Sequence, residues 1–208
     1  RAFGTDPDTI GAIATAALKG LEDGGVAGVI KHIPGHGRAM ADSHMELPRV
    51  TAGEDELSSD FAAFHHVRHA PMAMTAHISY DHFDEGRAAT VSPVMINEVI
   101  RGRIGFDGLL MTDDLGMQAL GGTLTERADA SIAAGCDMLL HCSGFLKDSK
   151  AILAEMTEVA EAAPELSGRA LERAEAAEQA SQRAMDFDIE AGWERFKSLI
   201  PTAGAMQA

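Results

Sequence analysis

Hydrophobic residues along the chain form two patterns that alternate. Helical spacing of apolar side chains marks residues 8–22, 54–69, 92–102, 124–134 and 146–162. Runs that are apolar almost throughout stand among these stretches, at residues 26–31, 72–77, 108–112 and 137–141. Strands of a parallel sheet are apolar almost throughout because both faces of such a sheet are buried. The alternation of strands and helices predicts an α/β fold with a parallel sheet.

Polar residues follow the carboxyl ends of the predicted strands, where (β/α)8 barrels and open doubly wound sheets both place their active sites. These residues are Lys31 and His32, Thr75 and His77, Thr112 to Asp114, and His141. A dinucleotide-binding sheet is the less favoured alternative, because no G-x-G-x-x-G opens a helix after a strand. We therefore expect a (β/α)8 barrel of the TIM type.

The number of strands is too small for a closed barrel, which has eight strands and typically about 250 residues. Residues 165–196 are rich in Ala, Glu, Arg and Gln and predict one or two exposed helices but no strand. We therefore expect residues 1–162 to form the C-terminal part of a (β/α)8 barrel and residues 163–208 to form a helical extension and tail. The missing half of the barrel is expected from the native full-length chain or from another polypeptide.

Composition limits the partners and the compartment. The chain has 208 residues, with 46% hydrophobic and 24% charged residues and a formal charge of −15. This charge leaves no broad basic patch for nucleic acid or for an anionic membrane surface, and no apolar run approaches the ~20 residues of a transmembrane helix. A strand between Cys136 and Cys142 would hold them beyond the ~7 Å limit of a disulfide, so we expect free thiols in a reducing compartment.

Residues 31–46 read KHIPGHGRAMADSHME and allow three interpretations. The first is a tight loop shaped by proline and glycine, in which the histidines are incidental. The second is a metal site, since His and Asp are usual zinc ligands, although neither H-E-x-x-H nor C-x-x-C is present. The third is acid-base catalysis. Asp42 and His44, two apart on an extended segment, project to the same side, so that Asp42 orients one ring nitrogen and the other is left for proton transfer.

A second motif, MTDDLGM at residues 111–117, supplies carboxylates directly after a predicted strand. At least one of Asp113 and Asp114 should face the mouth of the barrel; the alternative is a pair of helix-capping aspartates. A carboxylate opposite an acid is the arrangement used in glycoside hydrolysis. His77, at the end of the strand before this motif, either lines the pocket or makes a structural hydrogen bond.

The motifs K-H-x-P-G-H-G, D-S-H and T-D-D-L-G-M together resemble the bacterial β-N-acetylglucosaminidases of glycoside hydrolase family 3. The opening R-A-F-G-T-D-P is similar to the family's R-x-F-G-x-D-P segment, and the resemblance extends from Arg1 to about residue 145. It implies that Asp113 is the nucleophile and that His44 is the acid/base with Asp42 as its partner. It also implies that Arg1, Lys31 and His32 hold hydroxyl groups of the sugar ring.

The resemblance further implies a retaining reaction through a covalent glycosyl-enzyme, without metal or organic cofactor. The expected substrate is N-acetylglucosamine joined to a 1,6-anhydro-muramic unit, a peptidoglycan fragment that is recycled in the cytoplasm. Two alternatives stay open. A neutral histidine repels phosphate less than a carboxylate does, which would allow a phosphorylase; a half-barrel with intact motifs would also be compatible with sugar binding without turnover.

Overall fold

The computed structural model describes residues 3–142, 146, 148–181 and 188–199. Within these residues, four parallel strands form one sheet in the order β1-β3-β5-β6. They are β1 (Val29–Ile33), β3 (Met72–Thr75), β5 (Leu109–Asp114) and β6 (Met138–Leu140). Each strand overlaps a run that the hydrophobic pattern marked as a strand, so the predicted parallel sheet is confirmed.

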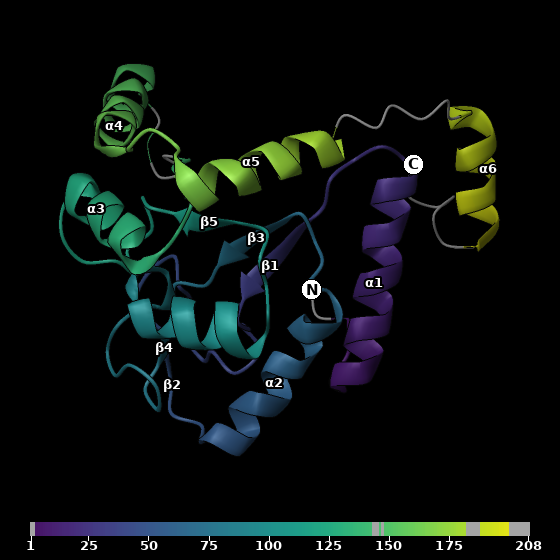
Figure 1. Cartoon of the computed structure of the whole chain (residues 1–208), viewed down its shortest axis with the longest axis horizontal. Helices are drawn as coiled ribbons and strands as arrows, with labels where there is room; N and C mark the ends of the chain where they lie inside the picture. Colours follow the sequence, from purple (N-terminus) through teal and green to yellow (C-terminus); the bar gives the residue numbers. More distant parts are fainter. Residues whose placement is uncertain (1–2, 143–145, 147, 182–187, 200–208) are drawn as a thin grey trace.

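Helices precede and follow these strands (Figure 1). They are α1 (Pro7–Asp23), α2 (Glu54–His66), α3 (Leu124–Ala134), α4 (Ser149–Ala162), α5 (Gly168–Ser181) and α6 (Ile189–Leu199). The helix predicted at residues 92–102 is instead a 3-10 turn, η1 (Ala89–Val91), followed by a π-helix, η2 (Met95–Arg103). At the end of η2 the N–H of Ile104 donates to the carbonyl of Val99, five residues back. The apolar spacing of the sequence does not distinguish this wider turn from an α-helix.

Local signals set the ends of two of the helices. The Asp6 carboxylate accepts a hydrogen bond from the N–H of Thr9 at 2.8 Å and so satisfies a donor at the start of α1. A capping box opens α3, in which Thr123 and Glu126 each accept a hydrogen bond from the other's backbone N–H. The same helix ends at Gly135, whose φ of 116° is a conformation that favours glycine.

A second, two-stranded parallel sheet joins β2 (Arg49–Val50) to β4 (Ser79–Tyr80). The hydrophobic pattern did not predict it, because strands of two residues are too short to show a period. This sheet places Tyr80 beside the loop that follows β1, where the buried tyrosine hydroxyl donates a hydrogen bond to the carbonyl of Gly35. Gly35 has a φ of 145°, which a residue with a side chain rarely adopts, so the K-H-I-P-G turn needs glycine there.

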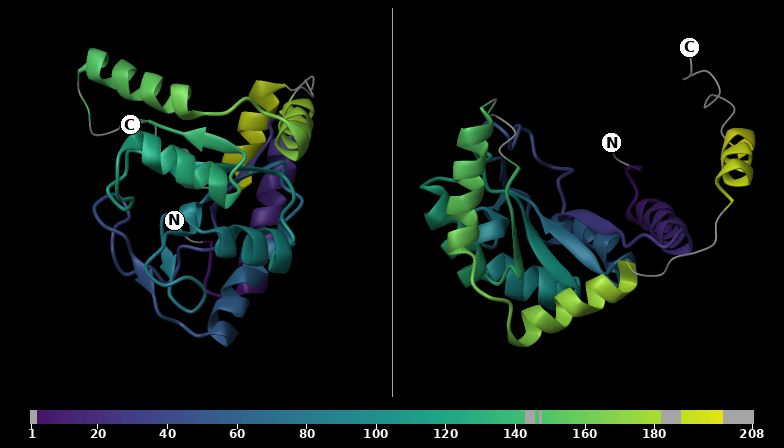
Figure 2. Two further views of the ribbon diagram at one scale, coloured as in Figure 1. Left: turned by 60° about the vertical axis from the view of Figure 1, so that its left-hand side comes forward. Right: turned by 90° about the horizontal axis from the view of Figure 1, so that it is seen from above.

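The main hydrophobic core covers one face of the four-stranded sheet. Among its fully buried members are residues of β1, β5, α2, η2 and the segment after η2: Ile33, Leu110, Leu57, Ile96, Ile100 and Phe106. The helices α4, α5 and α1 follow one another around the strands (Figure 2, right). Helices packed outside a parallel sheet are the arrangement of a (β/α)8 barrel, here present in part.

The other face of the sheet would be the inner face of the barrel. A row of residues crosses all four strands in register on this face: Lys31, Met74, Met111 and Met138. Each of these side chains is at least partly exposed. These three methionines are therefore not packed as fully buried core residues within the part of the chain that the structure describes, unlike Met95 and Met117.

Arg173 on α5 holds this helix at the amino ends of β5 and β6. Its guanidinium lies 3.0 Å from an oxygen of Asp137 and 2.7 Å from an oxygen of Asp107. The Asp137 carboxylate is 5% exposed and also accepts hydrogen bonds from Arg101 at 2.7 Å and from the N–H of Leu110 at 2.9 Å. A buried carboxylate is tolerated here because it is paired with two cations and a backbone donor.

Three further predictions concern the start of the C-terminal extension, the state of the two cysteines and the lack of a transmembrane helix. The boundary between residues 162 and 163 stays a prediction, although α5, which lies beyond it, packs against β5. Cys136 is buried, Cys142 is exposed, and both are free thiols, as expected. Over the described ranges, every helix is too short or too polar to cross a membrane.

Candidate active site

The two adjacent aspartates of the T-D-D motif end β5 and point to opposite sides of it. Successive side chains of a strand alternate between the two faces of the sheet. An oxygen of Asp113 lies 3.5 Å from Nε2 of His32, at the end of β1. The carboxylate of Asp114 instead accepts hydrogen bonds from the N–H groups of Gly116 and Cys142. Asp114 therefore holds the connections around the strand end but caps no helix, because α3 begins only at Leu124, whereas Asp113 faces His32.

Two hydrogen bonds hold Asp113 in one orientation, one accepted by its carboxylate and one donated by its backbone N–H. The N–H of Asp114 donates to its Oδ1 at 2.8 Å, and its own N–H donates to the hydroxyl of Thr75 at 3.3 Å. The Asp113 side chain is 16% exposed and that of His32 is 18% exposed. A carboxylate that is fixed and partly open to solvent has the properties of an attacking group.

Asp42 and His44 form the predicted dyad on the loop after β1. The Asp42 carboxylate oxygen lies 2.7 Å from Nδ1 of His44 and also accepts a hydrogen bond from the backbone N–H of His44 at 3.0 Å. The pKa of Asp42 is lowered, first by this backbone N–H and then by the imidazole. Because Asp42 holds Nδ1, the other nitrogen, Nε2, is the one available to exchange a proton.

The loop that carries the dyad is attached to the connection that follows Asp113. The backbone N–H of Gln118 donates to the carbonyl of His44 at 3.3 Å. Leu47, just after the loop, packs with a small cluster that contains Leu115 and Leu120. The D-S-H loop and the T-D-D-L-G-M turn thus meet at the same end of the sheet, although His44 and Asp113 are 69 positions apart in the sequence.

Two contributors to this site were not identified from the sequence. Nε2 of His36 lies 3.4 Å from the hydroxyl of the buried Ser43, between the two residues of the dyad. Arg127 on α3 donates hydrogen bonds to the carbonyls of Leu115 and Met117 at 2.7 and 3.1 Å and so supports the turn after Asp113. His36 was visible as the second histidine of K-H-I-P-G-H-G, whereas Arg127 had no motif to mark it.

His77 is buried beneath the site, with 1% of its surface exposed. Its Nε2 donates to the carbonyl of Asp114 at 3.0 Å, and its Nδ1 lies 2.7 Å from the hydroxyl of Thr90. Burial is the main cause that lowers the pKa of this ring. These contacts favour the structural alternative for His77 over substrate binding, since the ring has almost no surface for a ligand to touch.

Two more residues, Lys31 and Arg1, were predicted to bind the sugar, and a metal site was one alternative for the loop. Lys31 is exposed on β1, one residue before His32. Arg1 lies outside the described residues. For the metal interpretation, the described residues contain no group of three or more His, Cys, Asp or Glu side chains that could hold a metal ion.

Comparison with known proteins gives consistent matches to one family. The model of the glycosyl hydrolase family 3 N terminal domain matches residues 1–179. The β-hexosaminidase of Alkalilimnicola ehrlichii is 41% identical over 148 residues, which are 69% of this chain and 42% of that protein. The β-hexosaminidase of Shewanella frigidimarina is 35% identical over 188 residues, 88% of this chain and 54% of that protein. The chain thus spans about half the length of these curated relatives.

Solved structures agree with these sequence matches. The NagZ protein of Neisseria gonorrhoeae, solved in complex with N-trifluoroacetyl-D-glucosamine, has a TM-score of 0.74 at 28% identity, over 96% of this chain and 57% of that one. A family 3 β-N-acetylglucosaminidase from a Paenibacillus species has the same TM-score and identity, over 90% and 37% of the two chains. The expected barrel fold and the expected family are both confirmed. The chain belongs to glycoside hydrolase family 3, within its N-terminal domain.

Proposed function

We propose that this chain carries the reacting groups of a retaining β-N-acetylglucosaminidase, with Asp113 as nucleophile and His44, oriented by Asp42, as acid/base. The main support for this proposal is the contact between the D-S-H loop and the segment that follows the T-D-D motif. The dyad loop is hydrogen-bonded to the connection that follows Asp113, so an acid and a fixed carboxylate are assembled at one end of the sheet. The curated relatives are named β-hexosaminidases, which supports the same reaction class.

In the first step a carboxylate oxygen of Asp113 attacks the anomeric carbon, and the bond from that carbon to the leaving oxygen breaks. Nε2 of His44 gives its proton to the leaving oxygen, while Asp42 stabilises the ring during the transfer. In the second step the neutral Nε2 takes a proton from water as the water oxygen attacks the anomeric carbon. The bond to Asp113 then breaks and its electron pair returns to the carboxylate.

For the substrate we propose a peptidoglycan fragment in which N-acetylglucosamine is joined to a 1,6-anhydro-muramic unit, processed in the cytoplasm. The sugar derivative in the Neisseria structure is an N-acylated glucosamine, which supports the glycone. Lys31 and His32, beside Asp113, supply donors for the hydroxyl groups of the ring. Two unpaired cysteines are compatible with a reducing compartment. Arg1 would add a further donor.

The test uses the barrel completed by its missing half and analyses the products that it forms from this disaccharide with and without inorganic phosphate. Free N-acetylglucosamine in both conditions supports hydrolysis, whereas N-acetylglucosamine 1-phosphate formed only with phosphate would make the enzyme a phosphorylase. Asp113→Asn should abolish turnover by either route, because an amide cannot act as the attacking group. Binding without any product would identify a sugar-binding protein and contradict the proposal.

Fluorosugar trapping tests the nucleophile directly. A slowly hydrolysed fluoroglycoside should leave a covalent label on the peptide that contains Asp113, and Asp113→Asn should not be labelled. A label on Asp114 would contradict the assignment, since the structure turns that carboxylate away from His32.

A further inference from the structure

Hydrogen bonds through Asp114 connect Asp113 to the residues around the site. Its N–H fixes the Asp113 carboxylate, and its carbonyl accepts the hydrogen bond from His77. Its own carboxylate binds the N–H groups of Gly116 and Cys142 at 2.9 and 3.0 Å. A shift of the Asp114 backbone or side chain would therefore move the donor that orients the proposed nucleophile.

His141, at the end of β6, lies between Asp114 and helix α4. Its Nδ1 is 3.4 Å from Oδ1 of Asp114, and its Nε2 is 2.9 Å from Oε2 of Glu155 on α4. The imidazole side chain is 3% exposed, while that of Glu155 is 34% exposed. The ring thus connects two carboxylates, one partly buried beside the strand ends and one near the surface of the helix layer.

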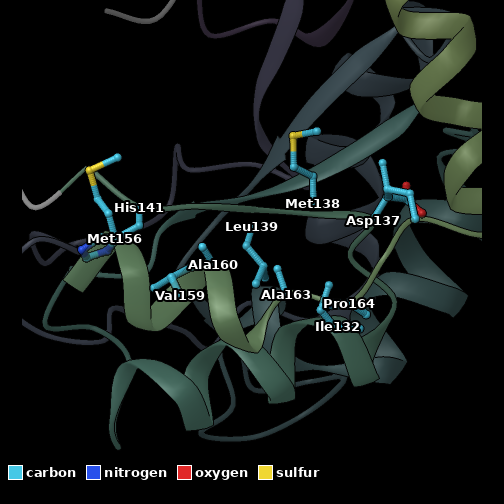
Figure 3. A pocket seen from close by; sticks show the side chains of 11 residues that line it. Ile132, Asp137, Met138, Leu139, His141, Met156, Val159, Ala160, Ala163 and Pro164 are labelled. Carbon is cyan, nitrogen blue, oxygen red and sulfur yellow. The ribbon is translucent and has the colours of Figure 1, made fainter. Parts of the chain in front are cut away.

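The surroundings of His141 hold the ring in place. A Cβ atom added at Gly116 would lie 3.1 Å from Cε1 of His141 and 3.2 Å from Oδ1 of Asp114, so the turn is closed against both groups. A cavity of about 300 Å³ between β6 and α4 has His141 at one end and is lined mainly by apolar side chains, Leu139 and Met156 among them (Figure 3). In such surroundings electrostatic contacts are stronger than in water.

We propose that His141, supported by Glu155, is a positioning residue that holds Asp114 and thereby keeps Asp113 in the orientation for attack. This inference rests on the proposed function of Asp113. Helix α4 takes no direct part in the site, but through Glu155 it then influences the rate of glycosyl-enzyme formation. Small displacements of a reacting group can lower a rate by up to about 100-fold, so the effect is measurable.

Two substitutions separate the contacts of His141. An asparagine places its amide nitrogen near the position of Nδ1, whereas a glutamine places it near that of Nε2. His141→Asn therefore keeps a donor toward Asp114 and loses Glu155, and His141→Gln does the reverse. If His141 acts through Asp114, the glutamine variant should be slower than the asparagine variant.

The measurement is inactivation by the fluorosugar, in the form of the protein that turns over the disaccharide. For His141→Gln we expect the rate constant of labelling to fall about 10-fold or more with an unchanged inhibition constant, because positioning affects the reacting step and not sugar binding. His141→Asn should lose less. Glu155→Gln, which keeps an acceptor but not the charge, should lose least.

Glu158→Gln is the matched control. Glu158 also lies on α4, and its carboxylate accepts hydrogen bonds from the backbone and hydroxyl of Thr125 on α3. It should leave the labelling rate unchanged. Equal losses in His141→Asn and His141→Gln, a loss in Glu158→Gln like that in Glu155→Gln, or wild-type rates in all variants would overturn the inference. A wild-type protein that is not labelled on Asp113 would instead overturn the proposed function, and this inference with it.

Discussion

At the scale of single residues, the roles proposed for Asp42 and His44 differ, and a comparison of two substrates can distinguish them. Protonation of the leaving oxygen matters for a sugar aglycone and matters little for a nitrophenol, which departs without help. His44→Ala should therefore slow glycosyl-enzyme formation by about 100-fold or more on the disaccharide and far less on the nitrophenyl glycoside. The nitrophenyl substrate should give a burst, because the second step still lacks its base.

Asp42→Ala should show a weaker version of the same pattern, because it removes the group that orients the ring but leaves the imidazole. Pre-steady-state release of nitrophenol, compared with disaccharide hydrolysis, measures both variants. Equal slowing of the first step on the two substrates would mean that His44 is not the acid/base.

His77 makes a prediction about stability and pH. Burial lowers the pKa of the folded-state imidazole, while the unfolded chain has the ordinary value of 6.5. As pH falls below 6.5, the unfolded state binds this proton and the folded state resists it, so the free energy of unfolding decreases with falling pH. The contribution is fully present above 6.5. Carboxylates whose pKa is lowered in the folded state, such as Asp81, change the free energy of unfolding only at pH values below their ordinary pKa of 3.8.

His77→Gln should remove part of this dependence. Urea unfolding at pH 7.5 and pH 5 should give a smaller difference between the two conditions than in the wild type, together with a loss of about 1–3 kcal/mol at pH 7.5 from altered buried hydrogen bonds. His66→Gln is the control, because the His66 side chain is 42% exposed. An unchanged difference in His77→Gln would show that this ring does not contribute to the acid sensitivity.

At the scale of elements, two arginines on α5 test what holds this helix to the barrel. Arg173 pairs with the buried Asp137, whereas Arg169 pairs with exposed carboxylates, one of them on Asp107. Arg173→Ala should cost about 2–4 kcal/mol of unfolding free energy, because it removes one of two cations from a buried carboxylate. Arg169→Ala should cost less than about 1 kcal/mol.

Chemical denaturation of the two variants measures this difference. It also bears on the boundary predicted after residue 162, since a large loss in Arg173→Ala would make α5 part of the barrel's cooperative unit. Equal, small losses would support an extension that is only loosely attached.

At the scale of the whole molecule, the sheet has two open edges. In the described part of the chain, β1 and β6 each pair with one neighbour in the sheet. The face that would line the barrel also leaves Val29 37% exposed and Met138 39% exposed. Open edges with apolar faces favour association with other chains.

We expect the 208-residue chain by itself to be inactive and either to aggregate or to pair with a segment that supplies the missing strands. Light scattering after size-exclusion chromatography, with activity measured on the same fractions, tests this. Co-expression with the preceding half of a family 3 barrel should restore a soluble complex. A soluble, active monomer of these residues alone would contradict the prediction.

The sequence by itself determined the architecture. Apolar runs that end in polar residues located the four strands and the end of the sheet that carries Asp113, because burial of both faces leaves a pattern within each strand. The D-S-H spacing also predicted the Asp42–His44 contact, although the extended segment expected there is wrong: residues 43–45 form a turn, in which the Asp42 carboxylate accepts the N–H of His44. Such features depend on neighbours in the sequence, and no distant contact is needed to recognise them.

Only the tertiary structure decided which distant groups meet. The hydrogen bond from Gln118 to His44, the burial of His77 under Asp114, and the bridge from His141 to Glu155 join segments that no period or motif connects. The π-helix and the two-residue strands could not be predicted from the sequence either, because their hydrogen bonds leave no distinct spacing of apolar side chains. Pairing between distant segments depends on how the elements pack, and packing depends on the whole set of side chains at once.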